Sequence, residues 1–230
     1  MCTLPFRIVS LQSPRRLTWL RLAIAAAAVA ACVAPALFPV RTVLARDLFD
    51  DLYERGQKQN AGLKTLTAAF TETSTSALLS TPLVERGTVY VERPSRVALR
   101  YTGPEARVVV IDGDTMTLTW PSAKLNATKD IGAAQRRIQK YFVDSSAKEL
   151  RGHFDVTAKE ADDRPSSYLI TMVPKRKQIL EGMTKLDLWI DRETLLLAAM
   201  RMTFPGGDTK TMTFADVKVN VPLDASVFAR

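Results

Sequence analysis

The sequence predicts an α+β protein: one long antiparallel sheet with a few short helices inserted in it. Two observations indicate the sheet. Beyond Gly62 the apolar residues recur at every second position, and Gly, Pro and Asp-Gly turn signals separate successive runs. A third observation indicates the helices, because two stretches place their apolar residues roughly three to four positions apart. No internal repeat or low-complexity segment interrupts the chain after residue 45.

The first 45 residues differ from the rest of the chain. They contain no Asp or Glu, and four arginines precede an alanine-rich apolar run that ends in "VLA" at Ala45. This pattern predicts a signal peptide at 1–45, cleaved near Ala45, followed by a single domain at 46–230. A transmembrane anchor is the competing interpretation. Pro35 and Pro39 interrupt the apolar run, which favours export and cleavage.

The predicted leader changes what the charge and the cysteines indicate. It holds five of the 32 Lys and Arg residues, so the net charge falls from +8 for the whole chain to +3 for residues 46–230. So small a charge, without an aromatic-spaced basic stripe, argues against a nucleic-acid partner. Both cysteines, Cys2 and Cys32, lie in the leader. The domain can therefore hold neither a disulfide nor a thiol nucleophile.

Cys32 leaves one alternative open. The tetrapeptide "VAAC" at 29–32 matches the small-residue pattern that precedes an acylated cysteine in bacterial lipoproteins. Acylation there would tether the protein to a membrane. The residues that follow, "VAPALFPVRTVLA", stay apolar instead of forming a polar tether, which favours the untethered form.

Each element follows from its local pattern. Residues 47–60 place Leu48, Leu52 and Tyr53 on one helical face, with aspartates in the first turn where the helix dipole favours them. The threonine-rich run at 66–76 predicts the first strand. Further strands are predicted at 84–92, 96–103, 106–112, 115–120, 153–159, 166–173, 184–191, 195–204 and 209–219. Residues 174–183 form a helix or a loop.

A second helix is predicted at 132–143. Its apolar face holds Ala134, Ile138, Tyr141 and Phe142, and Arg136, Arg137 and Lys140 lie opposite. This basic cluster and a second one at 175–177 are either solvated faces or surfaces for an anionic membrane or an acidic protein.

The sheet carries more apolar residues than these helices can cover. Val89, Val91, Val97, Leu99 and Tyr101 alternate along two adjacent strands, so they share one face. Such a sheet curls either around a core of side chains or around a cavity that the helices cap. The residue pattern alone favours the filled core.

The sequence holds few candidate catalytic groups. His153 is the only histidine, so a zinc site has neither a cysteine nor a second histidine in the domain. The run Asp112-Gly113-Asp114 lacks the other ligands of a calcium loop and predicts a hairpin turn instead. We therefore expect no enzymatic activity, no metal and no cofactor.

The chain resembles the periplasmic outer-membrane lipoprotein carrier family, the LolA type. The resemblance extends over roughly 47–228 and is carried by the order and spacing of several motifs. They are "LTAAFTET", "ERGTVYVERPSRVALRYTGP", "VVVIDGDTMTLTWPSAKLNATK", "LDLWIDRETLLLAAMRMTFPGGDTKTMTFADVKVN" and "PLDASVF".

The resemblance implies a strongly curved, unclosed antiparallel sheet, a half-barrel, with short helices forming a lid over an apolar cavity. Acyl chains of a lipoprotein would lie against Val89, Val91, Val97, Leu99 and Tyr101. Ile138 and Phe142 would face them from the lid. An arginine-proline pair of the family, matched by Arg93 and Pro94, would latch the lid through hydrogen bonds.

The resemblance also implies partners. The protein would be a periplasmic monomer that takes lipoproteins from an inner-membrane lipoprotein-releasing transporter to an outer-membrane acceptor lipoprotein. Relatives of the same fold include membrane-tethered acceptors and envelope sensors. A tethered acceptor with an acylated Cys32, or a sensor or other lipid-binding module, therefore remains an alternative.

Overall fold

The structure, a computed structural model, describes residues 47–138 and 145–229. The side chains of Arg137 and Ile138 are not described. The predicted leader at 1–45 with its Cys32 lies outside these residues, as does Phe142 of the predicted lid helix.

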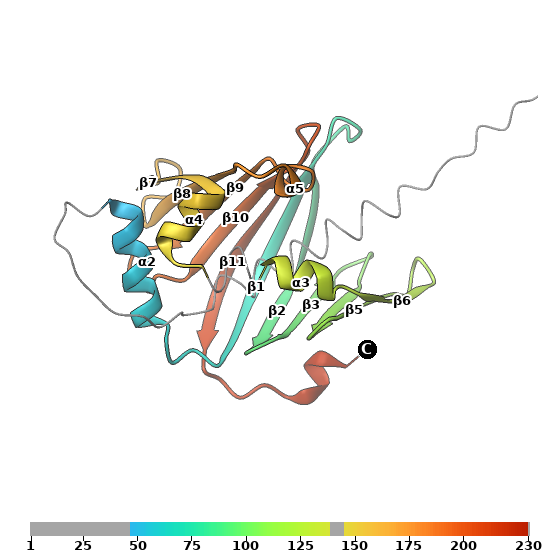
Figure 1. Cartoon of the computed structure of the whole chain (residues 1–230). Helices are drawn as coiled ribbons and strands as arrows, with labels where there is room; N and C mark the ends of the chain where they lie inside the picture. The colour runs from blue at the N-terminus through green and yellow to red at the C-terminus, as the bar shows by residue number, and fades with distance from the viewer. Residues whose placement is uncertain (1–46, 139–144, 230) are drawn as a thin grey trace, which may run out of the picture.

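All strands of the described chain join one 11-stranded antiparallel sheet, in the order β6-β5-β4-β3-β2-β1-β11-β10-β9-β8-β7. Strand β1 pairs with β11, which joins the two halves of the sheet at its centre. Strands β6 and β7 are consecutive in the chain but stand at opposite edges, so the sheet is not closed. Figure 1 shows the sheet curving behind the short helices. The predicted half-barrel is confirmed.

Apart from β6, the strands lie where the alternating runs predicted them, within a few residues. Their bounds are β1 (Thr65–Thr75), β2 (Leu83–Glu92), β3 (Arg96–Thr102), β4 (Val108–Asp112), β5 (Thr115–Trp120), β6 (Leu125–Asp130), β7 (Phe154–Glu160), β8 (Ser167–Pro174), β9 (Lys185–Asp191), β10 (Leu197–Thr203) and β11 (Thr209–Val219). Gly113 has a φ of 54° in the two-residue turn between β4 and β5, so Asp112-Gly113-Asp114 is a hairpin turn as predicted.

Helix α2 (Leu48–Gln59) matches the first predicted helix and begins after Asp47, whose side chain accepts a hydrogen bond from the backbone N–H of Phe49. Helix α3 (Gly132–Ile138) begins where the second was predicted. The segment left as helix or loop contains α5 (Lys177–Leu180), and a 3₁₀ turn, η2 (Ala225–Phe228), closes the chain.

Besides η2, two elements were not predicted: β6 and α4 (Ala147–His153). A capping box fixes the start of α4, because Ser146 and Glu149 each accept a hydrogen bond from the other's backbone N–H. Helices α2 and α4 lie together on the concave side of the sheet (Figure 1), and both contribute to its main buried cluster through Phe49, Leu52 and Leu150.

The convex side of the sheet is covered in part by the C-terminal segment. The guanidinium of Arg100 donates hydrogen bonds to the backbone carbonyls of Ser226, Val227 and Ala229 at 2.7, 2.9 and 2.9 Å. Phe228 is buried there against β3 and β4. None of the helices in the described part of the chain is long and apolar enough to span a membrane.

Candidate functional site: the concave face of the sheet

Strand register brings the five predicted face residues together. Val89 lies opposite Leu99, Val91 opposite Val97, and Gly87 opposite Tyr101. Residues directly opposite one another in an antiparallel pair point to the same side of the sheet. All five side chains are at most 5% exposed and belong to the main buried cluster on the concave side. Their contact with a ligand remains a prediction.

Methionines form the other half of this face. Strands β8, β10 and β11 contribute Met172, Met200, Met202 and Met212 to the same cluster, and Met183 joins it from the segment between α5 and β9; each is at most 5% exposed. Methionine is unbranched and polarizable, so it repacks around partners of different shape more readily than valine or isoleucine. This half of the face is therefore suited to an apolar ligand of variable conformation.

Helices α2 and α4 cover part of this face and are joined to each other by polar contacts. Arg151 of α4 forms ion pairs with Asp47 and Asp50, and its guanidinium lies 5.1 Å from the centre of the Phe49 ring. The hydroxyl of Tyr53 donates to the backbone carbonyl of Ser145, just before α4. The two helices therefore hold each other in place beside the sheet, as parts of one cover.

Arg93 follows β2 at the end of the concave face. Its backbone N–H donates to the carbonyl of Lys64 at 2.9 Å, and its side chain is half-buried. Burial lowers the pKa of Arg93, because the charged guanidinium is poorly solvated there. The buried Nη2 atom finds no hydrogen-bond partner among the residues that the structure describes. Pro94 next to it is exposed.

Charged side chains interrupt the apolar face at its opposite end. The carboxylate of Glu72, only 1% exposed, accepts a hydrogen bond from the Tyr101 hydroxyl at 2.8 Å and forms an ion pair with Lys210. Arg107 lies 3.7 Å above the Tyr101 ring and binds both carboxylate oxygens of Glu85. Each buried charge has an opposite charge beside it, which offsets the cost of removing it from water.

These contacts shift two pKa values upward. The pKa of Tyr101 lies well above its ordinary value, first because burial disfavours the phenolate and second because the Glu72 carboxylate is close. Burial lowers the pKa of Arg107, but its hydrogen bonds to Glu85 and the negative charge around it outweigh burial, so the net shift is upward.

The sequence reasoning missed this charged group, although one signal was present. Glu72 continues the apolar alternation of Leu66, Ala68 and Phe70, so a carboxylate falls on the buried register. Its partner Lys210 is 138 residues away and could not be paired with it from the sequence. Only the pairing of β1 with β11 brings these two residues together.

An aromatic pair separates the charged group from the valines. The rings of Phe70 and Tyr101 meet edge to face, with centroids 5.0 Å apart. Phe70 lies opposite Gly87, and a Cβ at that glycine would stand 2.6 Å from the ring and 2.2 Å from the Arg100 carbonyl oxygen. Glycine is therefore required there, because any side chain would push the ring off the strand.

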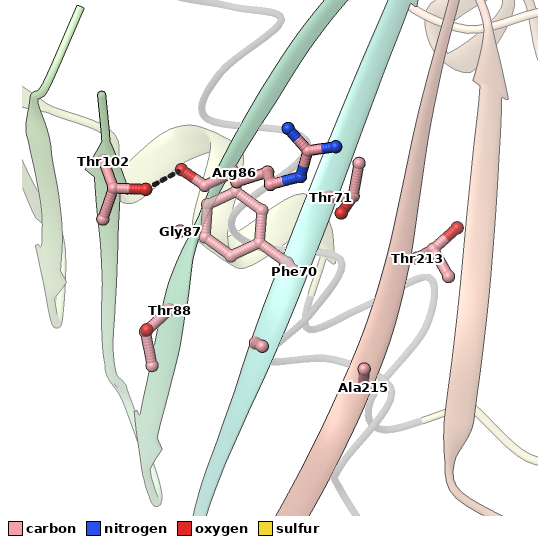
Figure 2. A pocket seen from close by; sticks show the side chains of 9 residues that line it. Phe70, Thr71, Arg86, Gly87, Thr88, Thr102, Thr213 and Ala215 are labelled. Carbon is pink, nitrogen blue, oxygen red and sulfur yellow. Dashed lines mark hydrogen bonds between the residues drawn. The ribbon is translucent and has the colours of Figure 1, made fainter. Parts of the chain in front are cut away.

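A separate pocket of about 260 Å³ opens on the convex side. Figure 2 shows its lining, in which threonines predominate together with Arg86 and small residues: Ala69, Phe70, Thr71, Arg86, Gly87, Thr88, Thr102, Thr213 and Ala215. Thr71 and Thr88 alternate along their strands with buried Phe70 and Val89, so they point away from the concave face. This pocket is lined mainly by residues that point to the convex side, so it is distinct from the candidate site.

The described residues contain no group of three His, Cys, Asp or Glu that could hold a metal ion. His153 ends α4, where its Nδ1 atom accepts a hydrogen bond from Arg176 at 2.8 Å. The arrangement can bind an apolar ligand on the concave face. The charged group around Glu72 lies at one end of this face, and Arg93 lies at the other.

The sequence and the fold were compared with those of known proteins. A sequence model of the family described as "Outer membrane lipoprotein carrier protein LolA" matches residues 61–230. An outer-membrane lipoprotein carrier protein of Chromohalobacter salexigens is 25% identical over 142 residues, which are 62% of this chain and 64% of that protein. The match thus spans just under two thirds of that relative's length.

A second relative, the outer-membrane lipoprotein carrier protein of Pseudomonas entomophila, is 24% identical over 165 residues, covering 72% of this chain and 76% of that protein. Among solved structures, a LolA superfamily protein from Nitrosomonas europaea aligns with a TM-score of 0.39 at 9% identity. That alignment covers 78% of this chain and 96% of the other.

Proposed function

The chain belongs to the LolA family of outer membrane lipoprotein carriers, and we propose that it binds the acyl chains of lipoproteins on the concave face of its sheet. The observation that carries the proposal is this buried face itself, formed by valines and leucines on β2 and β3 and by methionines on β8 to β11. It is covered by helices that are joined to one another by ion pairs.

Acyl binding requires the cover and the face to separate. Each methylene that a ligand buries contributes roughly 0.8 kcal/mol, so a long acyl chain can offset the loss of several side-chain contacts. The ion pairs of Arg151 are only partly buried, so they can persist while α2 and α4 move together. We propose that Ile138, the last residue of α3, and Phe142, which lies outside the described residues, also face the acyl chains from the lid.

Arg93 and Pro94 form the proposed latch. A half-buried guanidinium whose pKa is lowered by burial gains from any carbonyl that it can reach, because charge-assisted hydrogen bonds are the stronger kind. The proposal assigns its acceptors to the lid in the empty protein. A loaded acyl chain would displace them and leave Arg93 at the rim of the site.

The cellular role follows the family. The protein would be exported by its leader, cleaved near Ala45, and act in the periplasm as a monomeric, non-enzymatic carrier. It would receive lipoproteins from an inner-membrane lipoprotein-releasing transporter and deliver them to an outer-membrane acceptor. Both curated relatives named above are called outer-membrane lipoprotein carrier proteins.

Native mass spectrometry of the protein purified from its own envelope tests the binding proposal. We expect bound lipoprotein, and we expect a synthetic acylated lipopeptide to bind whereas the same peptide without acyl chains does not. Equal binding of the two peptides would contradict acyl recognition. The mass of the purified chain also distinguishes the alternatives at its start: a chain beginning at Arg46 excludes the tether, and an acylated Cys32 excludes the untethered carrier.

A further inference from the structure

The hairpin between β1 and β2 ends in an exposed apolar tip. Leu78 is 94% exposed, and Leu79, Leu83 and Val84 are 42%, 49% and 48% exposed. The tip lies beyond the start of β11, because Thr75 is the last β1 residue that pairs with that strand (Figure 1). From residue 73 to residue 84 the sequence has no charged side chain. Scattered exposed apolar residues are ordinary, but three leucines and one valine together, on the turn and at the start of β2, mark an interaction site.

Other exposed apolar side chains lie at the same end of the sheet. The pairing of successive strands shows which residues lie at this end. Thr75 pairs with Thr209, Thr209 with Thr203, Thr203 with Lys185, and the neighbouring Leu186 with Met172. Val173 at the end of β8 and Leu180 of α5 therefore lie at the same end of the sheet as the tip. Six of the seven large apolar side chains exposed in the described chain are therefore here, and only Val219 is at the other end.

Basic residues accompany them. Lys175, Arg176 and Lys177 are consecutive and exposed beside Val173. Lys175 is paired with Asp155 at 2.9 Å and Arg176 contacts His153, while Glu181 is the acidic residue of α5's C-terminal end. The tip and this basic segment are four strand steps apart, about 19 Å at the usual spacing between strands.

We propose that this end of the sheet docks on an anionic lipid bilayer, with Leu78 and Leu79 inserted among the headgroups and Lys177 and Arg176 beside lipid phosphates. A projecting turn without charged side chains can insert into the interfacial region of a bilayer. Val173 and Leu180 form a second apolar group about 19 Å away, and a bilayer is broad enough to contact both groups at once. A single pocket of a protein partner would accept the tip but would leave Val173 and Leu180 without contacts. The basic segment supplies attraction to anionic headgroups.

Vesicle binding tests the proposal without any lipoprotein, so its failure would leave the acyl-binding proposal intact. The probe is a vesicle of phosphatidylglycerol and phosphatidylcholine, compared with one of phosphatidylcholine alone. The double variant Leu78→Ser/Leu79→Ser removes the tip, and Val219→Ser is the matched control at the opposite end. Leu79 and Val219 are similarly exposed, at 42% and 43%, so the two sites lose comparable contacts on substitution. Lys177→Gln tests the basic contribution.

We expect the parent to bind the anionic vesicles, and the double serine variant to bind at least about tenfold more weakly, given the transfer free energy of two leucines. Val219→Ser should bind like the parent, and Lys177→Gln should weaken binding mainly at low salt. The chain from Arg46 onward has no cysteine, so a fluorescent label can be attached at Leu79→Cys or at Val219→Cys alone. On vesicles the label at Leu79→Cys should shift to an apolar fluorescence spectrum, and the label at Val219→Cys should not. Absence of binding by the parent, or equal binding by the double serine variant, would overturn the proposal.

Discussion

The hydroxyl of Tyr101 donates a 2.8 Å hydrogen bond to Oε2 of Glu72, and both side chains are buried on the concave face of the sheet. Lys210 contacts the other carboxylate oxygen, so the buried charge is compensated on both sides. Farther along the same face come only apolar groups, beginning with Phe70 and Val89. This contact therefore marks where the face changes from charged to apolar.

Removing one member of the Glu72–Lys210 pair should destabilise the fold strongly. Glu72→Leu leaves an ammonium and a phenol without their acceptor, and we expect the free energy of unfolding to fall by about 3–5 kcal/mol. The double variant Glu72→Leu/Lys210→Met removes both charges and should return to within about 1 kcal/mol of the parent. Urea unfolding of the parent and the two variants measures this. Equal stability of Glu72→Leu and the parent would show that the pair is not structurally important.

Tyr101 should make stability sensitive to alkaline pH. Burial and the nearby Glu72 carboxylate raise its pKa above the ordinary value of 10.0, so the folded protein retains the phenolic proton longer than the unfolded chain does. The associated stabilisation is complete below pH 10.0 and is lost as the pH rises through the raised pKa.

Tyr101→Phe isolates this effect. The stability difference between the parent and Tyr101→Phe should be constant at neutral and mildly alkaline pH and should shrink above pH 10.0, because only the parent loses the proton. Urea unfolding at several pH values, with tyrosinate absorbance as a second readout, checks it. A difference that does not change with pH would contradict the assignment.

Substituting alanine at Gly87 and at Gly56 compares a crowded glycine with an uncrowded one. A Cβ at Gly87 would stand 2.2 Å from a backbone carbonyl oxygen, whereas one at Gly56 of α2 meets nothing within 4 Å. Gly87→Ala should therefore cost about 3 kcal/mol or more, since the strand must move. Gly56→Ala should stabilise by about 0.5–1 kcal/mol through helix propensity. Thermal unfolding of the two variants measures these changes. Similar effects at the two sites would show that the Phe70 ring can move away from Gly87 at little cost.

The strands were predictable because alternation is a local property. Val89, Val91, Val97 and Leu99 share a face whatever the rest of the chain does, once the turn at 93–95 brings β2 beside β3. Strand β6 was missed because Leu125 is its only large apolar residue and most of its positions are exposed, as suits an edge strand. Helix α4 could have been found, because Ser146 and Glu149 have the spacing of a capping box.

The charged part of the site was not predictable in the same way. Arg107 and Glu85 are 22 residues apart and Glu72 and Lys210 are 138 apart, and each pair forms only because of strand order. Local patterns state which side a residue faces and cannot state which distant residue lies beside it. The covering contacts of Arg151 with Asp47 and Asp50 were missed for the same reason.

Arg93 provides a test of the latch. Replacing it by leucine removes a half-buried cation from the rim of the apolar face, so Arg93→Leu should bind an acyl probe about tenfold more tightly, the effect of one charge-assisted hydrogen bond. A latch also drives release, so transfer from Arg93→Leu to an acceptor should be slower than from the parent. Arg93→Lys keeps the charge but loses the planar fork. Tighter binding with parental transfer rates would show that Arg93 is a rim charge and not a latch.

The central claim is that acyl chains lie on the concave face, and photo-crosslinking tests it most directly. A lipopeptide whose acyl chain carries a photoreactive group near its terminal carbon is bound and irradiated, and the modified residues are identified by mass spectrometry. We predict saturable adducts on concave residues such as Val89, Leu99 and Met200, competed by unmodified acylated lipopeptide. Adducts confined to Thr71, Thr88 and Thr213 of the convex pocket, or adducts that do not saturate, would contradict the account.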